Sequence, residues 1–251
     1  EMLAALRESG LLELESEAKL IPLTGGVSCD VWRVESRLGP LVVKRPLPQL
    51  RVAAEWLAPV ARGTSEIRWL RKVAQIDAAL VPEIVAEFPV LHGFAMHFIP
   101  DSAVWKDALM AGEVDADFAA AMGDALGRIH SATAFDAETE QDFPNEALFT
   151  ALRIDPFLLE VARRNPDLAP ILQPMAEHLA KARIALVHGD VSPKNILMRG
   201  KQPIILDAEC ATYGDPAFDL AFCTAHLLLK AIWSGRADIK ACAAAMAQAY
   251  A

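Results

Sequence analysis

Three short apolar runs in the C-terminal half of the chain each lead to polar side chains. The runs at 186–187 and 196–198 flank a turn with a glycine and a proline, and the run at 204–206 ends on Asp207. Leu and β-branched residues in short runs, bounded by Gly and Pro, indicate buried strands with a turn between them. Because active sites are built from polar groups at strand ends, we expect the functional site here.

Asp190, Asn195 and Asp207 have a spacing suited to phosphate chemistry with a divalent cation. Asp190 and Asn195 lie five residues apart on one loop, and Asp207 follows twelve residues later at the end of the next strand. Asn195 and Asp207 could share Mg²⁺, which takes a few protein oxygens and leaves its other positions to water and phosphate. Asp190 would then face an incoming hydroxyl. The pattern H-x-D-x-x-x-x-N before a strand-terminal Asp matches the catalytic and metal-binding loops of kinases.

Three segments carry a resemblance to one family of small-molecule kinases. They are His188–Asn195, Leu206–Glu209 and Gly214–Ala221. On these motifs the chain resembles the aminoglycoside phosphotransferase and choline kinase-like family, and the likeness extends over nearly the whole chain. Gly189 stands where protein kinases carry Arg, and residues 207–209 read Asp-Ala-Glu where they carry Asp-Phe-Gly. Both departures indicate the small-molecule branch.

The resemblance implies an α+β, bilobal protein kinase-like fold. We expect a small antiparallel-sheet N-terminal lobe at residues 1–99, which binds nucleotide and ends in a hinge. A larger, mainly helical C-terminal lobe at residues 100–251 would carry the catalytic loop and the acceptor pocket. Members of this family usually run further, so we expect part of the C-terminal lobe to lie beyond this sequence. Four prolines between 151 and 182 predict short helices separated by turns.

Composition restricts the class of protein and its partners. The 251 residues, of which 53% are hydrophobic, can fill a sizeable core. A net charge of −9 argues against nucleic acid as a partner, because phosphate backbones repel an acidic field. Four scattered cysteines without a C-x-x-C pair fit a reducing cytoplasm. The N-terminus predicts no secretory signal, and the apolar run at 220–233 is too short to cross a membrane.

Gly25 and Gly26 mark a predicted turn between two strands in the N-terminal lobe. Glycines allow a close approach of the backbone, and N–H groups in such a turn could point at phosphate oxygens. The full G-x-G-x-x-G pattern is absent, so the two glycines alone would indicate an ordinary hairpin turn. By resemblance, Ser28 adds a hydroxyl contact to the phosphates of the nucleotide.

Lys44 closes an apolar strand, where a charge is unusual unless a partner neutralises it. In the kinase template this lysine holds the α- and β-phosphates and pairs with a glutamate on the following helix. Glu66 is our preferred partner, and Glu55 is the competitor. By resemblance to kinase hinges, the carbonyl of His97 and the N–H of Ile99 would meet the edge of the adenine ring.

The resemblance implies Mg-dependent transfer of the γ-phosphate of ATP, or of GTP, to a hydroxyl of a small molecule. Asp190 would be the catalytic residue, and Lys44 would fix the phosphates. A nucleotide-binding pseudokinase that acts as a scaffold is the alternative, but a binding module needs no base at Asp190. Eight acidic residues between 113 and 142 would attract an aminoglycoside, although a solvated surface is the favoured interpretation of this stretch. Aminoglycoside, amino alcohol, sugar and amino-acid acceptors all remain open. The sequence does not indicate an oligomeric state.

Three further polar residues near the motifs are expected to have supporting roles. His130 follows a run of apolar residues at helical spacing and is predicted to be buried and hydrogen-bonded. By resemblance, Asp219 braces the catalytic loop through backbone N–H groups. Glu209 is expected behind the metal site or at the surface.

Overall fold

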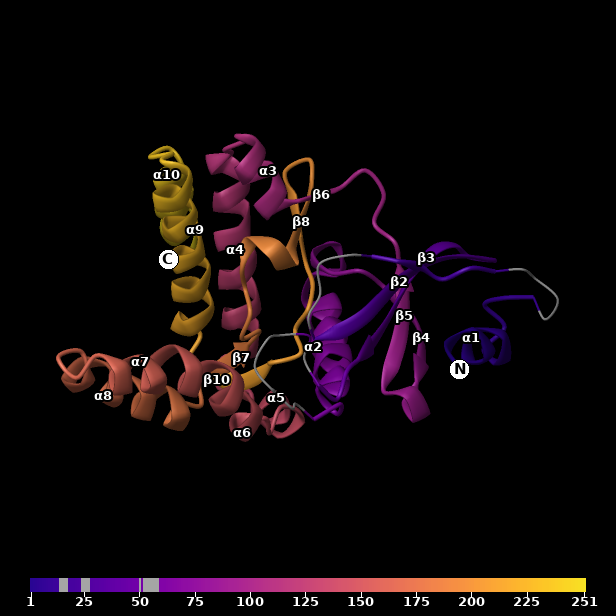
Figure 1. Cartoon of the computed structure of the whole chain (residues 1–251), viewed down its shortest axis with the longest axis horizontal. Coiled ribbons are helices and arrows are strands. Elements are labelled where there is room, and N and C mark those ends of the chain that lie inside the picture. Colours follow the sequence, from indigo (N-terminus) through magenta and orange to yellow (C-terminus); the bar gives the residue numbers. More distant parts are fainter. Residues whose placement is uncertain (14–17, 24–27, 50, 52–58) are drawn as a thin grey trace.

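The computed structural model describes residues 1–13, 18–23, 28–49, 51 and 59–251. A sheet-rich N-terminal lobe lies beside a larger, mainly helical C-terminal lobe (Figure 1). The elements of the N-terminal lobe are α1 (Met2–Glu8), β1 (Ile21–Pro22), β2 (Cys29–Ser36), β3 (Gly39–Pro46), α2 (Arg62–Asp77), the 3₁₀ turn η1 (Ala78–Leu80), β4 (Ile84–Phe88), the 3₁₀ turn η2 (Pro89–Leu91) and β5 (Gly93–His97).

The five strands of the N-terminal lobe form one antiparallel sheet in the order β1-β2-β3-β5-β4. Strand β3 lies in its centre and is buried on both faces, because α1 and α2 cover opposite sides of the sheet. Val43 packs with Leu6 of α1, whereas Val42 packs with Leu70 of α2. In this central strand Lys44 lies opposite Val31 of β2 and Phe94 of β5.

The C-terminal lobe consists of helices around three short pairs of strands. Its elements are β6 (Ala103–Val104), α3 (Trp105–Ala111), α4 (Ala116–Thr133), α5 (Ala137–Asp142), α6 (Glu146–Phe149), the π-helical segment η3 (Thr150–Leu159), α7 (Glu160–Arg164), α8 (Ala169–Lys181), β7 (Ala185–Val187), the 3₁₀ turn η4 (Pro193–Asn195), β8 (Ile196–Arg199), β9 (Gln202–Ile205), β10 (Thr212–Gly214), α9 (Ala217–Ser234) and α10 (Ile239–Tyr250). The small sheets pair β6 with β8, β8 with β9, and β7 with β10.

The prediction of short helices separated by turns over residues 151–182 was wrong for residues 151–164. Helix α6, segment η3 and helix α7 follow one another without a break, although Pro156 lies inside η3. The wider i→i+5 turn of a π-helix accommodates a residue that has no N–H to donate. Helix α8 likewise runs for 13 residues with Pro174 in its interior. This long helical run places its side chains beside the catalytic loop.

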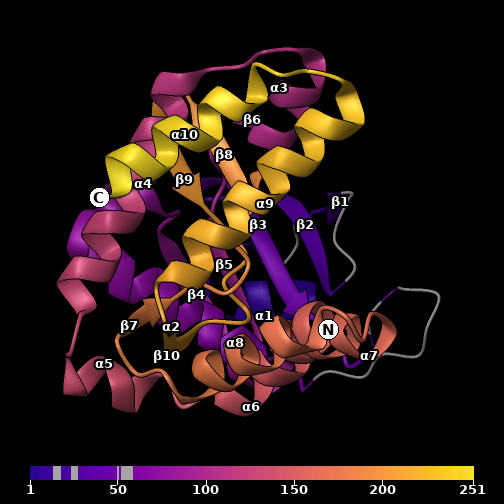
Figure 2. The ribbon, with the colours of Figure 1, turned by 90° about the vertical axis from the view of Figure 1, so that its left-hand side faces the viewer.

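Helix α4 is the central helix of the C-terminal lobe, as the apolar spacing of its sequence predicted. Its N-terminus is capped by the side chain of Asp115, which accepts from the Phe118 N–H at 3.1 Å. Helix α10 packs across it (Figure 2), and the contact is so close that a Cβ on Gly123 would lie 2.1 Å from the Met246 carbonyl oxygen. The core of this lobe continues into the N-terminal lobe through α2, β3 and β5.

Helix α9 is longer than the apolar run that marked it in the sequence. It begins at Ala217 and contains 18 residues, so the prediction that this run was too short for a membrane span does not hold by length. Among the described residues it is the single helix with the length and apolar composition of such a span, a feature that buried helices share. One side of α9 packs into the core through Cys223 and Leu227.

Candidate functional site

The catalytic loop connects β7 to β8 and has a tightly constrained backbone. Gly189 has a φ of +80°, and a Cβ there would lie 2.7 Å from the Cys210 carbonyl oxygen. A residue with a side chain would therefore be strained and would collide with the segment after Asp207. Asp219, fully buried at the start of α9, accepts from the N–H groups of His188 at 2.7 Å and Gly189 at 2.9 Å. The expected bracing of the loop by Asp219 is present.

His188 joins the catalytic loop to the strand that carries Asp207. Its Nδ1 accepts from the Asp190 N–H at 3.0 Å, so Nε2 carries the proton and donates to the Leu206 carbonyl at 3.0 Å. Burial lowers the pKa of His188, which keeps the ring neutral. The ring also contacts the edge of Trp69, with ring centroids 4.7 Å apart. His188 therefore positions two segments and is not placed to react.

His130 lies behind the loop and supports Asp219. Its Nε2 is 3.3 Å from Asp219 Oδ2, and its Nδ1 is 2.9 Å from the hydroxyl of Tyr250 in α10. Both nitrogens therefore have partners, and His130 is buried as the sequence predicted. The C-terminal helix is thereby linked to the catalytic loop through two side chains.

The Asp190 carboxylate is buried and surrounded by donors that all bind one oxygen. Oδ2 is 2.9 Å from Asn195 Nδ2, 3.1 Å from Lys194 Nζ and 3.2 Å from an Arg153 guanidinium nitrogen. Asn195 Nδ2 also donates to the Asp190 carbonyl at 3.0 Å, which fixes the turn. Among the residues that the structure describes, no donor contacts Oδ1, so this oxygen can meet a further hydroxyl.

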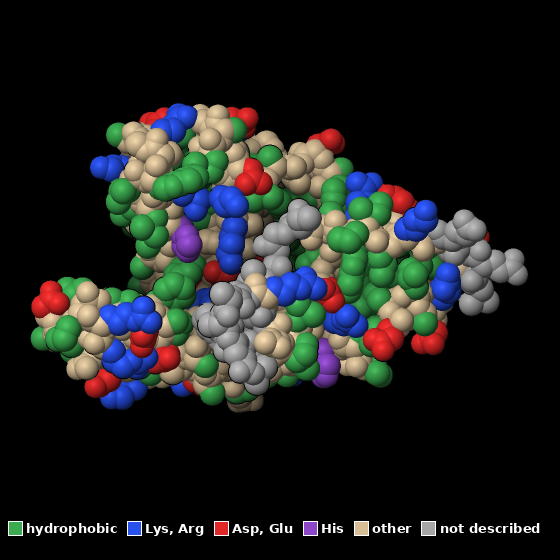
Figure 3. Space-filling view, in the orientation of Figure 1, with side chains coloured by type: hydrophobic (Ala, Val, Ile, Leu, Met, Phe, Trp, Pro, Cys, Tyr) green, Lys and Arg blue, Asp and Glu red, His purple; other side chains and the backbone are tan. Residues whose placement is uncertain are grey.

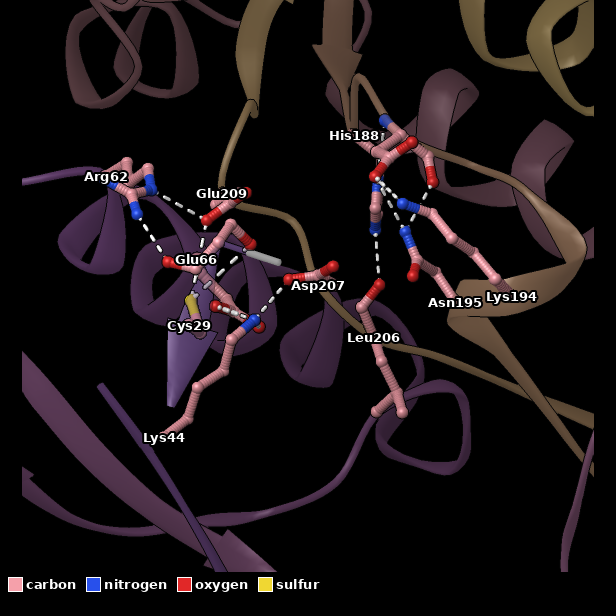
Figure 4. Close-up of polar contacts among 12 residues, drawn as sticks. Cys29, Lys44, Arg62, Glu66, His188, Lys194, Asn195, Leu206, Asp207 and Glu209 are labelled. Carbon is pink, nitrogen blue, oxygen red and sulfur yellow. Dashed lines mark hydrogen bonds and ion pairs between the residues drawn. The ribbon is translucent and has the colours of Figure 1, made fainter. Parts of the chain in front are cut away.

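Lys44, Glu66 and Asp207 form a buried ion-pair network between the lobes (Figure 4). Lys44 Nζ lies 2.9 and 2.7 Å from the two carboxylate oxygens of Glu66 and also contacts Asp207 Oδ1. The side chains of Lys44 and Glu66 are 6% and 2% exposed. The preferred partner of Lys44 is thus in contact with it, whereas the competitor Glu55 lies outside the described residues.

Burial and mutual attraction shift the pKa of all three groups of this network. Burial raises the pKa of Glu66 to about 7, against the opposing attraction of Lys44. Although burial acts in the other direction, Lys44 lowers the pKa of Asp207 to about 2. Burial alone would lower the pKa of Lys44, but the Asp207 and Glu66 carboxylates raise it well above its ordinary value. Lys44 therefore stays charged at neutral pH.

Asn195 and Asp207 have the chemistry that a magnesium ion requires. The Asn195 side chain donates through Nδ2, which leaves its Oδ1 as an acceptor, and the Leu206 N–H donates to the Asn195 carbonyl at 2.9 Å. Asp207 has a φ of +70°, a left-handed conformation that is strained for a residue other than glycine and frequent at functional sites. Within the described part of the chain, no three His, Cys, Asp or Glu residues cluster as metal ligands. Both oxygens suit Mg²⁺ if phosphate and water complete its shell.

The loop after Asp207 is tied to the N-terminal lobe by a second buried ion pair. Arg62, at the start of α2, donates from Nε to Glu209 Oε2 at 2.8 Å. Another of its nitrogens donates to the carbonyls of Ser28 and Leu47, each at 2.6 Å. Glu209 is thus buried and held by Arg62, which also binds the strand-end carbonyls next to the predicted phosphate turn (Figure 4).

The remaining nucleotide-site predictions concern the turn before β2 and the hinge. Gly25 and Gly26 lie outside the described residues. Ser28 is described and buried, and its hydroxyl lies 3.8 Å from Cys29 Sγ. His97 ends β5 at the junction of the lobes, and its N–H donates to the Glu83 carbonyl at 2.9 Å. Ile99 follows in the connection, where its carbonyl accepts from Ser102 Oγ at 2.9 Å.

Sequence reasoning missed two arginines of this site. Arg153 lies on η3 and, besides its ion pair with Asp190, donates to the Gly189 carbonyl. Arg62 stands 147 residues before Glu209. Neither arginine belongs to a motif. Arg153 could have been noticed as a cation inside an apolar helical segment, whereas the sequence contains no signal that points to Arg62.

The sequence of the chain is similar to a family of phosphotransferases and to curated kinases. A family model described as a phosphotransferase enzyme family matches residues 19–251. Methylthioribose kinase of Bacillus cereus (strain G9842) is 22% identical over 252 residues, which cover 90% of this chain and 64% of the relative. The chain therefore spans slightly less than two thirds of the length of the curated relatives that it matches.

Solved structures share the arrangement of the two lobes. An amicoumacin kinase in complex with AMP-PNP, Ca²⁺ and amicoumacin has a TM-score of 0.64 and 15% identity, over 100% of this chain and 77% of that one. The ethanolamine kinase of Plasmodium vivax has a TM-score of 0.60 and 11% identity, over 97% and 70%. A type VIII aminoglycoside-3'-phosphotransferase has a TM-score of 0.58 and 18% identity, over 99% and 89%. These similarities confirm the predicted α+β, bilobal fold.

Proposed function

Because the chain belongs to the phosphotransferase enzyme family, we propose that it transfers the γ-phosphate of ATP or GTP to a hydroxyl of a small molecule, with Mg²⁺. The observation that carries this proposal is the convergence of four side chains from separate segments. Lys44 comes from β3, Asp190 and Asn195 come from the catalytic loop, and Asp207 follows β9. Phosphoryl transfer needs mainly this positioning of groups and the neutralisation of charge.

Asp190 is the residue that we assign to the acceptor. Its free Oδ1 orients the hydroxyl and takes the proton as the oxygen attacks the γ-phosphorus. A new O–P bond forms, the bond between the γ-phosphorus and the bridging oxygen breaks, and the nucleoside diphosphate leaves with the electron pair. Asn195 holds the carboxylate by binding Oδ2 at 2.9 Å, so Oδ1 keeps its direction.

Lys44, Asn195 and Asp207 are the residues that we assign to the nucleotide. The ammonium of Lys44, held by Glu66, binds phosphate oxygens, since Lys44 remains protonated at neutral pH. Asn195 Oδ1 and the Asp207 carboxylate would hold Mg²⁺, which neutralises phosphate charge when bound. The predicted contacts of Gly25, Gly26 and Ser28 with the phosphates, and of His97 and Ile99 with the base, remain part of this proposal.

The chemistry also suggests where the reaction occurs. All four cysteines are free and buried, which fits a reducing compartment that contains nucleoside triphosphates. We therefore propose a cytoplasmic protein.

The test is transfer of labelled γ-phosphate from ATP and from GTP to a panel of hydroxylated small molecules in the presence of Mg²⁺. Asp190→Asn should reduce transfer by about a thousandfold, the scale of a lost general base, while nucleotide binding measured by thermal shift is retained. Asp124→Asn, on the exposed side of α4, is the matched control. Nucleotide binding without transfer to any acceptor or to water would support the pseudokinase alternative. Unchanged transfer by Asp190→Asn would refute the assignment of the base.

A further inference from the structure

One side of α9 presents polar and aromatic residues to the space beside the catalytic loop. They recur every four residues: Phe218, Phe222, His226 and Lys230. Side chains with this spacing lie above one another on a helix. The neighbouring stripe of Asp219, Cys223, Leu227 and Ala231 is buried in the core, and α9 contacts the turn η4 of the catalytic loop. The first stripe therefore borders the site without being part of the core.

A continuous set of contacts leads from Asp190 along this stripe. Arg153 binds Asp190 at 3.2 Å, and its guanidinium carbon lies 5.8 Å from the centroid of the Phe222 ring. The Phe222 ring in turn contacts the His226 ring, with centroids 4.8 Å apart. The half-exposed ring of Phe157 in η3 also contacts the Phe222 ring edge-on, with centroids 5.5 Å apart. The wall beside Asp190 is therefore aromatic near the base and basic further along α9.

Both paired and unpaired cations lie along this space; Lys106, for example, is 3.8 Å from the carboxylate of its neighbour Asp107. Lys194 is compensated by Asp190 at 3.1 Å. Among the described residues Lys230 forms no ion pair, and burial together with the charge of Lys106 lowers its pKa. Burial and the charge of Lys230 likewise lower the pKa of His226. Blue Lys and Arg side chains and one histidine lie along the hollow beside α9 (Figure 3).

Four of the eight acidic residues between 113 and 142 form ion pairs away from the catalytic loop. Their carboxylates pair with cations of α2, α4 and the turn between β8 and β9. The pairs are Asp115 and Asp117 with Lys201, Asp124 with Arg128, and Asp136 with Lys72. These four carboxylates are therefore neutralised at a distance from the catalytic loop.

Resting on the proposed kinase function, we infer that the acceptor is an anionic hydroxyl compound whose carboxylate or phosphate group is bound by Lys230 and His226. Its hydroxyl meets Asp190, and its carbon skeleton lies against Phe222 and Phe157. An anion would offset the repulsion of Lys230 by Lys106 and Lys194, because a Coulomb interaction is strong where water is partly excluded, and His226 can donate a hydrogen bond to it. A cationic acceptor would add to the same repulsion.

The experiment compares acceptors that share a carbon skeleton and differ in charge. One set is 4-hydroxybutyrate, its amide and 4-aminobutanol; the other is a sugar phosphate, the neutral sugar and the amino sugar. The first set reports on a carboxylate and the second on a phosphate. Transfer from Mg-ATP is measured for each compound, and binding in the presence of Mg-ADP is followed by ligand-observed NMR. The anionic member of at least one set should bind and react best.

Lys230→Glu tests the residue that would carry the specificity. Reversing this charge should raise the KM for the anionic acceptor about tenfold or more, because attraction becomes repulsion, while the KM for ATP stays within about twofold. Lys240→Glu makes the same change at an exposed position of α10 and should leave both KM values unchanged. Lys230→Met, which keeps the length of the side chain without charge, should have an intermediate effect.

Several outcomes would overturn this inference and leave the proposed function intact. They are preference for the amines, failure of every anionic compound to bind, an unchanged acceptor KM in Lys230→Glu, or a raised KM for ATP alone. The last result would assign these cations to the phosphates of the nucleotide. Failure of the proposed function has a different signature: no compound and no water receives phosphate, even where the anionic compounds bind.

Discussion

Removal of the charge of Lys44 should destabilise the fold in a way that depends on pH. The Lys44→Met variant keeps the length of the side chain but leaves Glu66 and Asp207 without the cation that both contact. A unit charge pair at the observed 2.7 Å attracts by about 6 kcal/mol at an effective dielectric constant of about 20. Desolvation of the ammonium offsets part of this attraction. We therefore expect a loss of about 3–5 kcal/mol in the free energy of unfolding at pH 8.

The loss in the free energy of unfolding should be smaller at low pH, because the carboxylates left without Lys44 can take up a proton. Burial already raises the pKa of Glu66 to about 7 from 4.5. A carboxyl whose folded pKa is raised contributes most below its unfolded pKa, and that contribution is lost as the pH rises through the folded value. Without Lys44, the pKa values of both Glu66 and Asp207 should be raised, so protonation of either carboxylate at low pH would stabilise the variant. The difference between variant and parent should therefore shrink by at least about 1.4 kcal/mol from pH 8 to pH 5.

Urea unfolding of both proteins at pH 5 and pH 8, followed by circular dichroism, measures these differences. Lys201→Met is the matched control, because Lys201 pairs with Asp115 at the surface and its side chain is 61% exposed. Its loss should be between about 0 and 1 kcal/mol at either pH. A Lys44→Met variant that is destabilised equally at both pH values, or no more than the control, would refute the reasoning.

Three further changes test other parts of the site. Asp219→Ala should lower the free energy of unfolding by about 2–4 kcal/mol, because two buried N–H groups of the catalytic loop lose their acceptor; chemical denaturation measures it, and a loss below 0.5 kcal/mol contradicts the bracing role. Gly123→Ala should lower the melting temperature by several degrees, since its Cβ would lie 2.1 Å from the Met246 carbonyl oxygen; an unchanged melting curve would refute this close contact. Glu66→Gln should remove a rise in kcat/KM centred near pH 7, because the parent needs Glu66 ionised to hold Lys44; persistence of that rise in the variant would assign it to another group.

Local patterns in the sequence predicted several elements and the centre of the site, whereas the bilobal fold followed from the resemblance to a kinase family. The apolar periodicity before His130 predicted α4, and the alternation of short apolar runs with turns predicted the strands around Asp190. The motif predicted that Asp190, Asn195 and Asp207 would come together, since the two loops leave adjacent short strands. The contact between Lys44 and Glu66 followed from the kinase template rather than from any local pattern.

Other predictions failed where packing overruled a local preference. Four prolines argued for broken helices, yet Pro156 lies in a continuous helical run because a π-helical segment tolerates it. Four carboxylates of the acidic stretch between residues 113 and 142 pair with Lys201, Arg128 and Lys72, and the sequence did not indicate these partners. Charge counts along a chain do not show where each charge is neutralised.

The sequence by itself determined the elements, the catalytic loop and the residues of the motif, because helix periodicity, turn chemistry and loop spacing act over a few residues. Only the tertiary structure decided which distant charges meet. Arg62 reaches Glu209 over 147 positions, and Arg153 reaches Asp190 from a helical segment with no motif of its own. Lys230 lies one turn beyond His226 on α9, in the stripe whose Phe222 ring lies beside Arg153. Such contacts depend on how whole elements pack, and electrostatic interactions follow distance in space rather than distance along the chain.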